Sequence, residues 1–260
     1  MLLETRDLSK HFGGVHALNR FELAVARGEL VGIIGPNGSG KTTFFNVLMG
    51  LYPPDGGEIL FGETPRSLVG LRPHRIAGLG VARTFQTLRI FPNLTVLENV
   101  LIGMHTRLRT GYWSAMLRTP ALRREEQEAE GKALETLAFF GRRLLSMCNE
   151  PAFSLSYANR RRLEIVRVLA ARPQLILLDE PAAGMNPSET KELMEDIIRI
   201  HGMGHTMLVI EHDMTLIEGV AQRVIALDHG SKVAEGSFAR VRSDPAVIEA
   251  YLGKAYQRSA

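Results

Sequence analysis

The segment from Gly35 to Thr42 constrains this chain more than any other stretch of its sequence. It reads Gly-Pro-Asn-Gly-Ser-Gly-Lys-Thr, which has the glycines, the lysine and the hydroxyl residue of a phosphate-binding loop at the required spacing. An apolar run, Leu30 to Ile34, precedes it, and a helix is expected to begin at Lys41. Glycines let successive backbone N–H groups turn inward toward an anion, and the helix N-terminus adds positive potential. The sequence therefore predicts an α/β fold that binds a nucleotide phosphate.

Each position of this loop has an expected role. Lys41 is expected to reach the β- and γ-phosphates, Thr42 to offer its hydroxyl to Mg²⁺, and Thr43 to contact the α-phosphate through its backbone. The other residues expected to line the phosphates are Gly35, Pro36, Asn37, Gly38, Ser39 and Gly40. The alternative is a glycine-rich turn with an incidental lysine, which the strand before the loop and the helix after it disfavour.

A pair of acids follows a second apolar run. Residues 175–178 lead directly into Asp179 and Glu180, as expected of a central parallel strand that delivers acids to its carboxyl edge. Asp179 is predicted to hold Mg²⁺, directly or through water, and Glu180 to polarise a water for attack on the γ-phosphate. The alternative, acids at a helix N-terminus, is weakened by the phosphate loop upstream.

The rest of the sequence alternates between strand-like and helix-like patterns, which predicts a parallel sheet. Further strands are expected at 2–8, 19–26, 58–61, 174–178 and 206–210. Helices are expected at 95–104, 120–140, 159–171 and 188–201, with two short strands and two short helices between about 222 and 253. From about 73 to 142, apolar residues at helical spacing among charges predict a helical insert.

Composition excludes several classes of protein. The chain has 260 residues and a net charge of +3, an excess too small to indicate nucleic-acid binding. The single cysteine, Cys148, excludes an internal disulfide and a cysteine-based zinc site, which fits a reducing compartment. No apolar run approaches the roughly 18 residues of a membrane span, and the N-terminus lacks the plan of a signal peptide. We therefore expect a cytoplasmic protein.

With these motifs in this order, the chain resembles the nucleotide-binding subunits of ABC transporters over nearly its whole length. Phe12 matches the aromatic residue that stacks on adenine in that family, and Gln86 matches a glutamine that contacts magnesium or the attacking water. His212 matches a histidine that contacts the γ-phosphate. Without the resemblance, Phe12 would be interpreted as an aromatic residue of a strand, Gln86 as a polar loop residue and His212 as a surface or core histidine.

The resemblance also implies a fold and its parts. It implies a P-loop NTPase of the ABC nucleotide-binding class, a single α/β unit over residues 1–260 with an antiparallel β subdomain and a helical subdomain. About residues 1–85 and 160–260 would form the RecA-like core with the β subdomain. About residues 86–159 would form the helical subdomain.

Several stretches are similar to the ATP-binding subunits of branched-chain amino-acid importers. These stretches are 161–165, 182–187, 210–214, 247–253 and an insert at 110–113 ahead of Thr119-Pro120. The resemblance implies an ATPase whose hydrolysis of ATP powers such an importer. Importers of urea, other amides or other amino acids are the alternatives, because their ATP-binding subunits look much alike.

One segment departs from the family pattern. Residues 155–159 read Leu-Ser-Tyr-Ala-Asn, where the family usually has Leu-Ser-Gly-Gly-Gln. In the family this segment faces the γ-phosphate of ATP held by the other subunit, which makes Ser156, Ala158 and Asn159 implied nucleotide contacts. Ala158 adds a methyl group where the backbone approaches the ligand, while a helix beginning near Asn159 still presents N–H groups. We expect function to persist, and a degenerate composite site is the alternative. Asn186 is a second departure, since many members have aspartate there.

The resemblance implies partners and a location. The partners would be integral-membrane permease subunits and a second ATP-binding subunit, identical or a sister, in a head-to-tail dimer. The link to a solute-binding protein would be indirect, and the chain would lie on the cytoplasmic face of the membrane. The coupling surface is expected at about 86–101, whose apolar residues are equally compatible with packing under the helical insert: Leu88, Ile90, Phe91 and Leu94.

Other classes of function are weighed against this one. A soluble ABC-type ATPase acting on DNA or the ribosome usually carries paired cassettes or long coiled coils, and this chain has one phosphate loop and no sustained heptads. A nucleoside or small-molecule kinase would need an acceptor site and a lid. A binding-only nucleotide switch is compatible with Ala158.

Three consecutive arginines, Arg160, Arg161 and Arg162, could suggest a phosphate contact. The apolar residues of their helix form a separate stripe, so we expect these arginines to form a solvated face without a chemical role.

Overall fold

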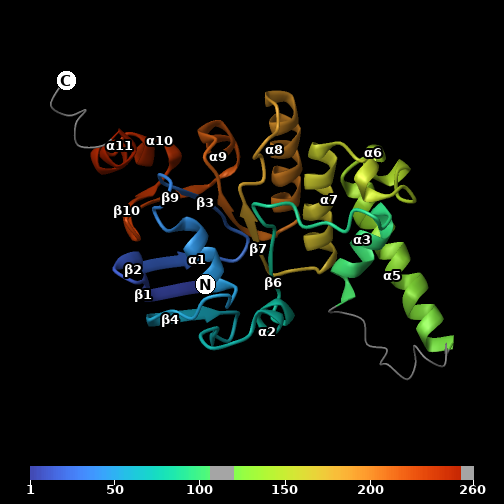
Figure 1. Cartoon of the computed structure of the whole chain (residues 1–260), viewed down its shortest axis with the longest axis horizontal. Helices are drawn as coiled ribbons and strands as arrows, with labels where there is room; N and C mark the ends of the chain where they lie inside the picture. Colours follow the sequence, from blue (N-terminus) through green and yellow to red (C-terminus); the bar gives the residue numbers. More distant parts are fainter. Residues whose placement is uncertain (106–119, 253–260) are drawn as a thin grey trace.

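The molecule contains two β-sheets, the smaller of which lies at the lower left in Figure 1. The computed structural model describes residues 1–105 and 120–252, and within them the larger sheet has six strands in the order β10-β9-β3-β8-β7-β6. Strands β9, β3, β8, β7 and β6 run parallel, and β10 pairs antiparallel with β9 at one edge. Their bounds are β3 Leu30–Ile34, β6 Val81–Arg83, β7 Leu175–Asp179, β8 Thr206–Ile210, β9 Arg223–Asp228 and β10 Ser231–Gly236.

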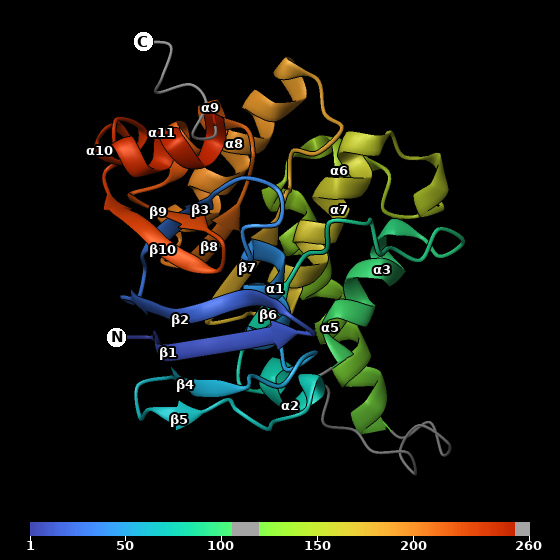
Figure 2. The same cartoon turned by 60° about the vertical axis from the view of Figure 1, so that its left-hand side comes forward.

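The smaller sheet is antiparallel and has the order β2-β1-β4-β5 (Figure 2). Its strands are β1 Leu3–Phe12, β2 Val15–Val25, β4 Gly56–Phe61 and β5 Arg66–Ser67. It shares one hydrophobic cluster with helix α1 (Lys41–Leu48) and with one face of the larger sheet. Phe21 of β2 and Phe44 of α1 meet there with ring centroids 4.9 Å apart.

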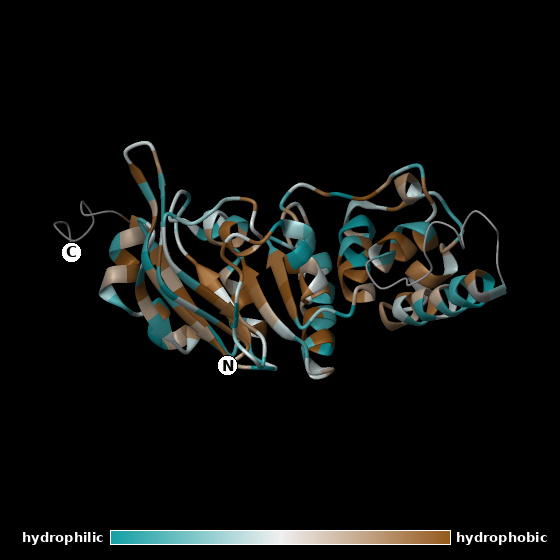
Figure 3. Ribbon diagram, turned by 90° about the horizontal axis from the view of Figure 1, so that it is seen from below, coloured by the Kyte–Doolittle hydropathy of each residue, from teal (hydrophilic) through white to brown (hydrophobic). Residues whose placement is uncertain are grey.

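The larger sheet is buried on both faces. Along β7, Leu175 and Leu177 belong to the cluster with α1, whereas Ile176 and Leu178 belong to a second cluster. Because neighbouring residues of a strand point to opposite faces, this alternation means that β7 is covered on both sides. The strands at the centre of the molecule are accordingly hydrophobic along their length (Figure 3).

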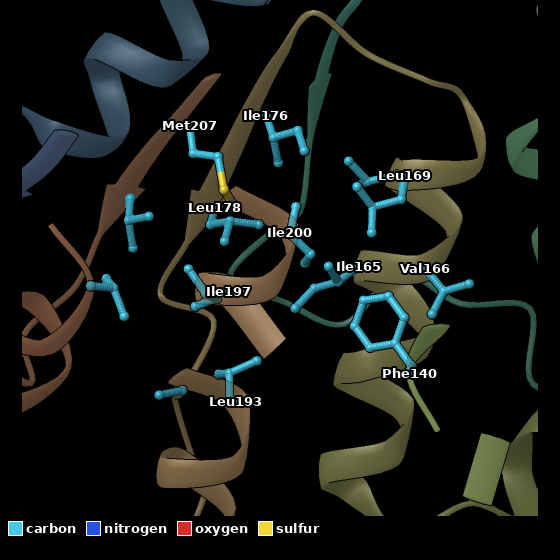
Figure 4. Packing of buried hydrophobic residues seen from close by; sticks show 14 of the residues in the cluster. Phe140, Ile165, Val166, Leu169, Ile176, Leu178, Leu193, Ile197, Ile200 and Met207 are labelled. Carbon is cyan, nitrogen blue, oxygen red and sulfur yellow. The ribbon is translucent and has the colours of Figure 1, made fainter. Parts of the chain in front are cut away.

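Helices α7 (Tyr157–Ala170) and α8 (Pro187–Gly202) cover the second face. Figure 4 shows the residues that join them to the sheet: Ile165, Val166 and Leu169 of α7, Leu193, Ile197 and Ile200 of α8, Ile176 and Leu178 of β7, and Met207 of β8. Since each of these side chains is at most 7% exposed, α7 is anchored by an extensive apolar contact.

The other helices are short, except for α5. Helices α3, α5 and α6 gather on one side of the sheet next to α7 (Figure 1), in the region where a helical insert is expected. The remaining bounds are α2 Pro73–Gly78, α3 Val96–Gly103, α5 Pro120–Phe139, α6 Arg142–Ser146, α9 Met214–Val220, α10 Phe238–Arg242 and α11 Pro245–Leu252, with a 3₁₀ turn at Ala152–Ser154. Among the residues described, no helix is both long and apolar enough to cross a membrane.

The predicted parallel sheet is confirmed, and strands 30–34 and 206–210 have the predicted bounds. Strands β5 and β6 and helices α2, α6 and α9 were not predicted from the sequence, because their two to seven residues are too short for a periodic pattern. The family-like stretch at 110–113 and residue 253 lie outside the described residues.

The expectation that the three arginines of α7 form a solvated face is wrong. Arg161 is 2% exposed and Arg162 is 6% exposed, and half-buried Arg160 donates to the Leu155 carbonyl at 2.9 Å. Arg162 forms ion pairs with Asp196 at 2.9 Å and with Glu192 at 2.8 Å, both on α8. These partners lie 30 or more residues away in sequence, so the local charge pattern does not predict them.

Candidate nucleotide-binding site

The loop between β3 and α1 lines a cavity of about 220 Å³. Gly40 has φ +107°, and a β-carbon there would lie 2.3 Å from the carbonyl oxygen of Ala17 on β2. Gly38 has φ +82°, and a β-carbon there would have no atom within 4 Å. Glycine is therefore favoured at position 40 because the β2 backbone approaches it closely, and at position 38 because the backbone there is left-handed. The other residues around this cavity are Val15, Asn37, Ser39, Lys41, Thr42, Thr43, Gln86, Glu180 and His212.

Helix α1 begins without a side-chain cap. Its N-cap is Gly40, which offers no side-chain acceptor, and its first turn contains no acidic residue. Six other helices of the described residues have an N-terminal amide capped by a side chain, which comes from Thr95, Ser156, Asn186, Asp213, Ser237 or Asp244. Because the first amides of a helix have no intrahelical acceptor, α1 offers them to an anion in the cavity.

Lys41 lies inside the loop. It is 5% exposed, and its Nζ donates to the carbonyl oxygens of Gly35 at 2.7 Å and Pro36 at 2.9 Å. Burial lowers the pKa of Lys41, and the nearby charges of Glu180 and Asp179 oppose this shift. The ammonium group therefore lies within the loop and near Glu180 and Asp179. A nucleotide phosphate bound in the cavity would accept charge-assisted hydrogen bonds from it.

Asp179 lies at the end of β7 and is paired with an arginine that the sequence analysis did not single out. Arg83 of β6 donates to Asp179 Oδ2 at 2.6 Å and to Asn46 Oδ1 of α1 at 2.7 Å. The guanidinium lies 5.3 Å from the ring centroid of Phe45 and 5.2 Å from that of Phe85. Burial raises the pKa of Asp179, and the hydrogen bond and charge of Arg83 act in the opposite direction. Arg83 thus holds an otherwise costly buried carboxylate in place.

Glu180 contacts two other residues that were predicted from the sequence to belong to the site, Gln86 and His212. Its Oε2 accepts a hydrogen bond from Gln86 Nε2 at 2.9 Å, and its Oε1 lies 2.8 Å from His212 Nε2. Gln86 follows β6 and His212 follows β8, the two strands that flank β7. Glu180 has φ +48°, a backbone conformation that few residues other than glycine adopt. Residues in such conformations cluster at functional sites.

Glu211 is a further site residue that the sequence analysis missed. It is 3% exposed, and its carboxylate accepts from the backbone N–H of Ala182 at 2.7 Å and of His212 at 2.9 Å. Burial raises the pKa of Glu211, and the backbone hydrogen bonds lower it in part. Glu211 therefore ties the segment after Glu180 to the turn that carries His212.

The residues present fit a magnesium ion. Thr42 is exposed at the cavity, and Asp179 Oδ1 is buried without a hydrogen-bond partner among the residues that the structure describes. The described part of the chain contains no cluster of three His, Cys, Asp or Glu side chains able to hold a metal by itself. Mg²⁺ suits such a sparse site, because it is usually held by one or two side chains, water and substrate phosphates.

Phe12 ends β1 beside the cavity. It pairs across the hairpin with Val15, which lines the cavity, and it is 44% exposed. Its ring meets that of Tyr52 edge to face at 5.3 Å, and Lys10 Nζ lies 5.3 Å from its centroid. Much of the ring therefore remains accessible.

The 155–159 segment lies apart from the phosphate cavity, since none of its residues lines it. Helix α7 begins at Tyr157, two residues before the predicted start, and Ser156 caps it by accepting from the Asn159 N–H at 3.3 Å. Ala158 is 3% exposed, and Asn159 lines a separate cavity of about 560 Å³ with residues of α7 and α8. Asn186, the second departure from the family pattern, caps α8 as an aspartate would.

A phosphate loop after β3 at the carboxyl edge of a parallel sheet, with acids at the end of β7 on the far side of β8, defines a P-loop nucleotide-binding protein. Residues 18–183 match the family described as ABC transporter, and residues 231–257 match the one described as branched-chain amino acid ATP-binding cassette transporter. LivG of Salmonella typhimurium, a high-affinity branched-chain amino acid transport ATP-binding protein, is 46% identical over 255 residues, 98% of each chain. The chain therefore belongs to the ABC transporter ATP-binding family, in its branched-chain amino acid branch.

Solved structures confirm the predicted fold class. The chain superposes on an ATP-binding cassette of an ABC transporter in its ADP conformation with a TM-score of 0.83 and 32% identity, covering 97% of this chain and 99% of that one. It also superposes on the dimeric structure of a bacterial ABC transporter cassette with a TM-score of 0.74 and 25% identity, covering 91% and 99%.

Proposed function

We propose that this chain binds and hydrolyses ATP, and that hydrolysis powers the import of branched-chain amino acids through membrane permease subunits. The observation that supports the enzymatic part is the position of Glu180. It contacts Gln86 and His212, and all three residues line the same cavity as the phosphate loop. The solute assignment is supported by the name of the relative that is 46% identical over nearly the whole chain. Importers of urea, another amide or another amino acid are the alternative for the solute.

Each side chain around the cavity has its own role in hydrolysis. Glu180 accepts a hydrogen bond from a water and directs its oxygen toward the γ-phosphorus. The bond from the water oxygen to phosphorus forms, the bond from phosphorus to the β,γ-bridging oxygen of ATP breaks so that ADP leaves, and the proton of the water passes to the Glu180 carboxylate. Gln86 and His212 fix the orientation of Glu180, and His212, which lines the same cavity, would contact the γ-phosphate oxygens. Lys41 and the first amides of α1 stabilise the charge that develops on the phosphates.

The remaining contacts concern the nucleotide and its metal. We assign Thr42, Asp179 and Gln86 to Mg²⁺, which when bound neutralises phosphate charge. Phe12, whose ring is partly accessible beside the cavity, would stack on adenine, and Thr43 would contact the α-phosphate through its backbone.

The nucleotide site is completed by a second ATP-binding subunit, identical or a sister, in a head-to-tail pair. Ser156, Ala158 and Asn159 do not line the phosphate cavity of their own chain, and a similar cassette forms a dimer. Residues 1–85 and 160–260 would act as the core that holds the nucleotide, and 86–159 as the helical subdomain that moves against it.

The membrane partners would contact the chain near residues 86–101 on the cytoplasmic face of the membrane. Phe91 is 47% exposed there, which favours a docking role, whereas Ile90 packs against the core cluster. The solute itself and its binding protein would not touch this chain, and no nucleic-acid partner is proposed.

Glu180→Gln tests the proposal because it keeps the shape of the side chain and removes its charge. We expect the wild type to hydrolyse ATP and the variant to bind ATP, stall and accumulate as a dimer. Glu218→Gln, at an exposed glutamate of α9, is the matched control and should behave as wild type. A wild type that binds ATP without hydrolysing it, alone and with its membrane partners, would contradict the proposal and favour the binding-only switch suggested by Ala158.

A further inference from the structure

A buried ion pair on α7 holds the backbone of the loop that carries Gln86. Arg161 Nη1 and Glu164 Oε2 lie 3.1 Å apart, and the two side chains are 2% and 1% exposed. The loop concerned, residues 85–89, is called here the Gln86 segment. It belongs to a stretch, residues 84–94, that forms neither helix nor strand.

Both members of the pair bind this segment. Arg161 donates to the Phe85 carbonyl oxygen at 2.6 Å and also to the Gln86 carbonyl oxygen. Glu164 Oε1 accepts from the N–H of Phe85 at 3.2 Å and from that of Arg89 at 3.4 Å. One ion pair therefore satisfies four backbone groups of a segment that has no sheet or helix partner of its own.

These bonds connect α7 to the proposed catalytic carboxylate. Arg161 binds the backbone of Gln86, and the side chain of the same Gln86 donates to Glu180 at 2.9 Å. The connection thus passes through a single residue. The planar, forked guanidinium can fix both carbonyl groups of the segment at once, which a lysine ammonium cannot do in the same way.

The attachment of α7 does not need this pair. The helix is anchored by Ile165, Val166 and Leu169, which pack against α8 and β7 (Figure 4). Replacing a buried ion pair by apolar residues of similar size is often neutral or stabilising, because desolvation of the two charges is costly. The pair therefore does something that apolar packing cannot, and its only hydrogen-bond partners besides itself among the described residues are backbone groups of the Gln86 segment.

We propose that Arg161 and Glu164 are positioning residues that hold the Gln86 segment against α7 and thereby keep the Gln86 side chain at Glu180. The proposal rests on the function proposed above only in taking Glu180 as the residue that orients the attacking water.

The test replaces both charges at once, so that no unpaired charge is left buried. In Arg161→Met with Glu164→Leu, we expect cooperative unfolding to be retained and amide hydrogen exchange in the Gln86 segment to rise at least about tenfold. ATP affinity should stay within about twofold, because the phosphate loop is untouched, whereas kcat should fall at least about tenfold through misplaced Gln86. Arg161→Met with Glu164→Gln keeps an acceptor for the two amides and should recover most of the exchange protection.

A matched control uses the neighbouring buried pair. Arg162→Met with Asp196→Leu also removes two buried charges from α7 and its surroundings, but these residues do not bind the Gln86 segment. This control should leave exchange in that segment unchanged. The proposal is overturned if the Arg161/Glu164 variant keeps wild-type exchange, if exchange rises with kcat unchanged, or if the control variant shows the same rise. Exchange needs no turnover, so an inactive wild type would refute the proposed function while this readout still decides the role of the pair.

Discussion

Removing Arg83 alone should destabilise the protein strongly, because Asp179 would then be a buried carboxylate without a counterion. The two side chains are 3% and 1% exposed and lie 2.6 Å apart. In Arg83→Met, the apolar volume between Phe45 and Phe85 is largely retained, so that loss of charge and hydrogen bonding is the main change. The same substitution removes the bond to Asn46 of α1.

The magnitude follows from the burial of the pair. Breaking a buried ion pair by removing one partner costs about 3–5 kcal/mol, since the remaining charge keeps its desolvation penalty without compensation. The bond to Asn46 is not added, because contributions of contacting groups are not additive. Arg83→Met with Asp179→Leu removes both charges and should recover most of the loss.

Urea unfolding at pH 7 measures these differences, provided that the dependence of stability on urea concentration is unchanged between variants. Arg6→Met is the control: its pair with Glu4 has side chains 56% and 33% exposed, and we expect no measurable change. A loss below about 1 kcal/mol in Arg83→Met, or a double variant as unstable as the single one, would refute the reasoning.

Three further predictions concern the loop, a half-buried histidine and a helix cap. Gly40→Ala should destabilise the protein and weaken ATP binding more than Gly38→Ala does, because only the first places a methyl group 2.3 Å from the Ala17 carbonyl oxygen; urea unfolding and nucleotide titration measure both. Burial lowers the pKa of His205 in the folded protein from its ordinary value of 6.5. The folded state therefore keeps its full stability above pH 6.5 and loses stability as pH falls below 6.5, because the unfolded chain binds the proton more readily. His205→Gln should therefore flatten the loss of stability between pH 7 and pH 5 measured by urea unfolding, and an unchanged slope would contradict the assignment. Asn186→Ala should cost about 1 kcal/mol of unfolding free energy, whereas Asn186→Asp should cost nothing measurable, because aspartate caps a helix equally well.

The parts of the site that the sequence predicted are those whose signal is local. The phosphate loop and the Asp179-Glu180 pair each directly follow an apolar strand. The residue types that identify each motif, their spacing and the strand before them therefore lie within one short stretch of sequence. Gln86 and His212 carry no such signal alone, and only the family resemblance singled them out. Their meeting with Glu180 depends on the strand order β8-β7-β6, which local pattern does not specify.

The parts that the sequence did not predict depend on distant partners. Arg83 pairs with a residue 96 positions away, and Arg161 binds backbone groups 75 and 76 positions away. A charged residue in an amphipathic pattern is expected to face water, but α7 is covered on most sides and its charges are compensated internally. The error at the three arginines therefore came from assuming one free helix face.

Mixing two inactive variants tests the head-to-tail ATPase most directly. Lys41→Ala disables the phosphate loop of one copy, and Ser156→Arg blocks the start of α7 in the other. In a mixed pair, the intact loop of the Ser156→Arg copy faces the intact Ser156 of the Lys41→Ala copy, so one complete site remains. We expect the mixture to hydrolyse ATP although neither variant does so alone. An inactive mixture, in the presence of mixed dimers and beside an active wild type, would contradict a site shared between two subunits.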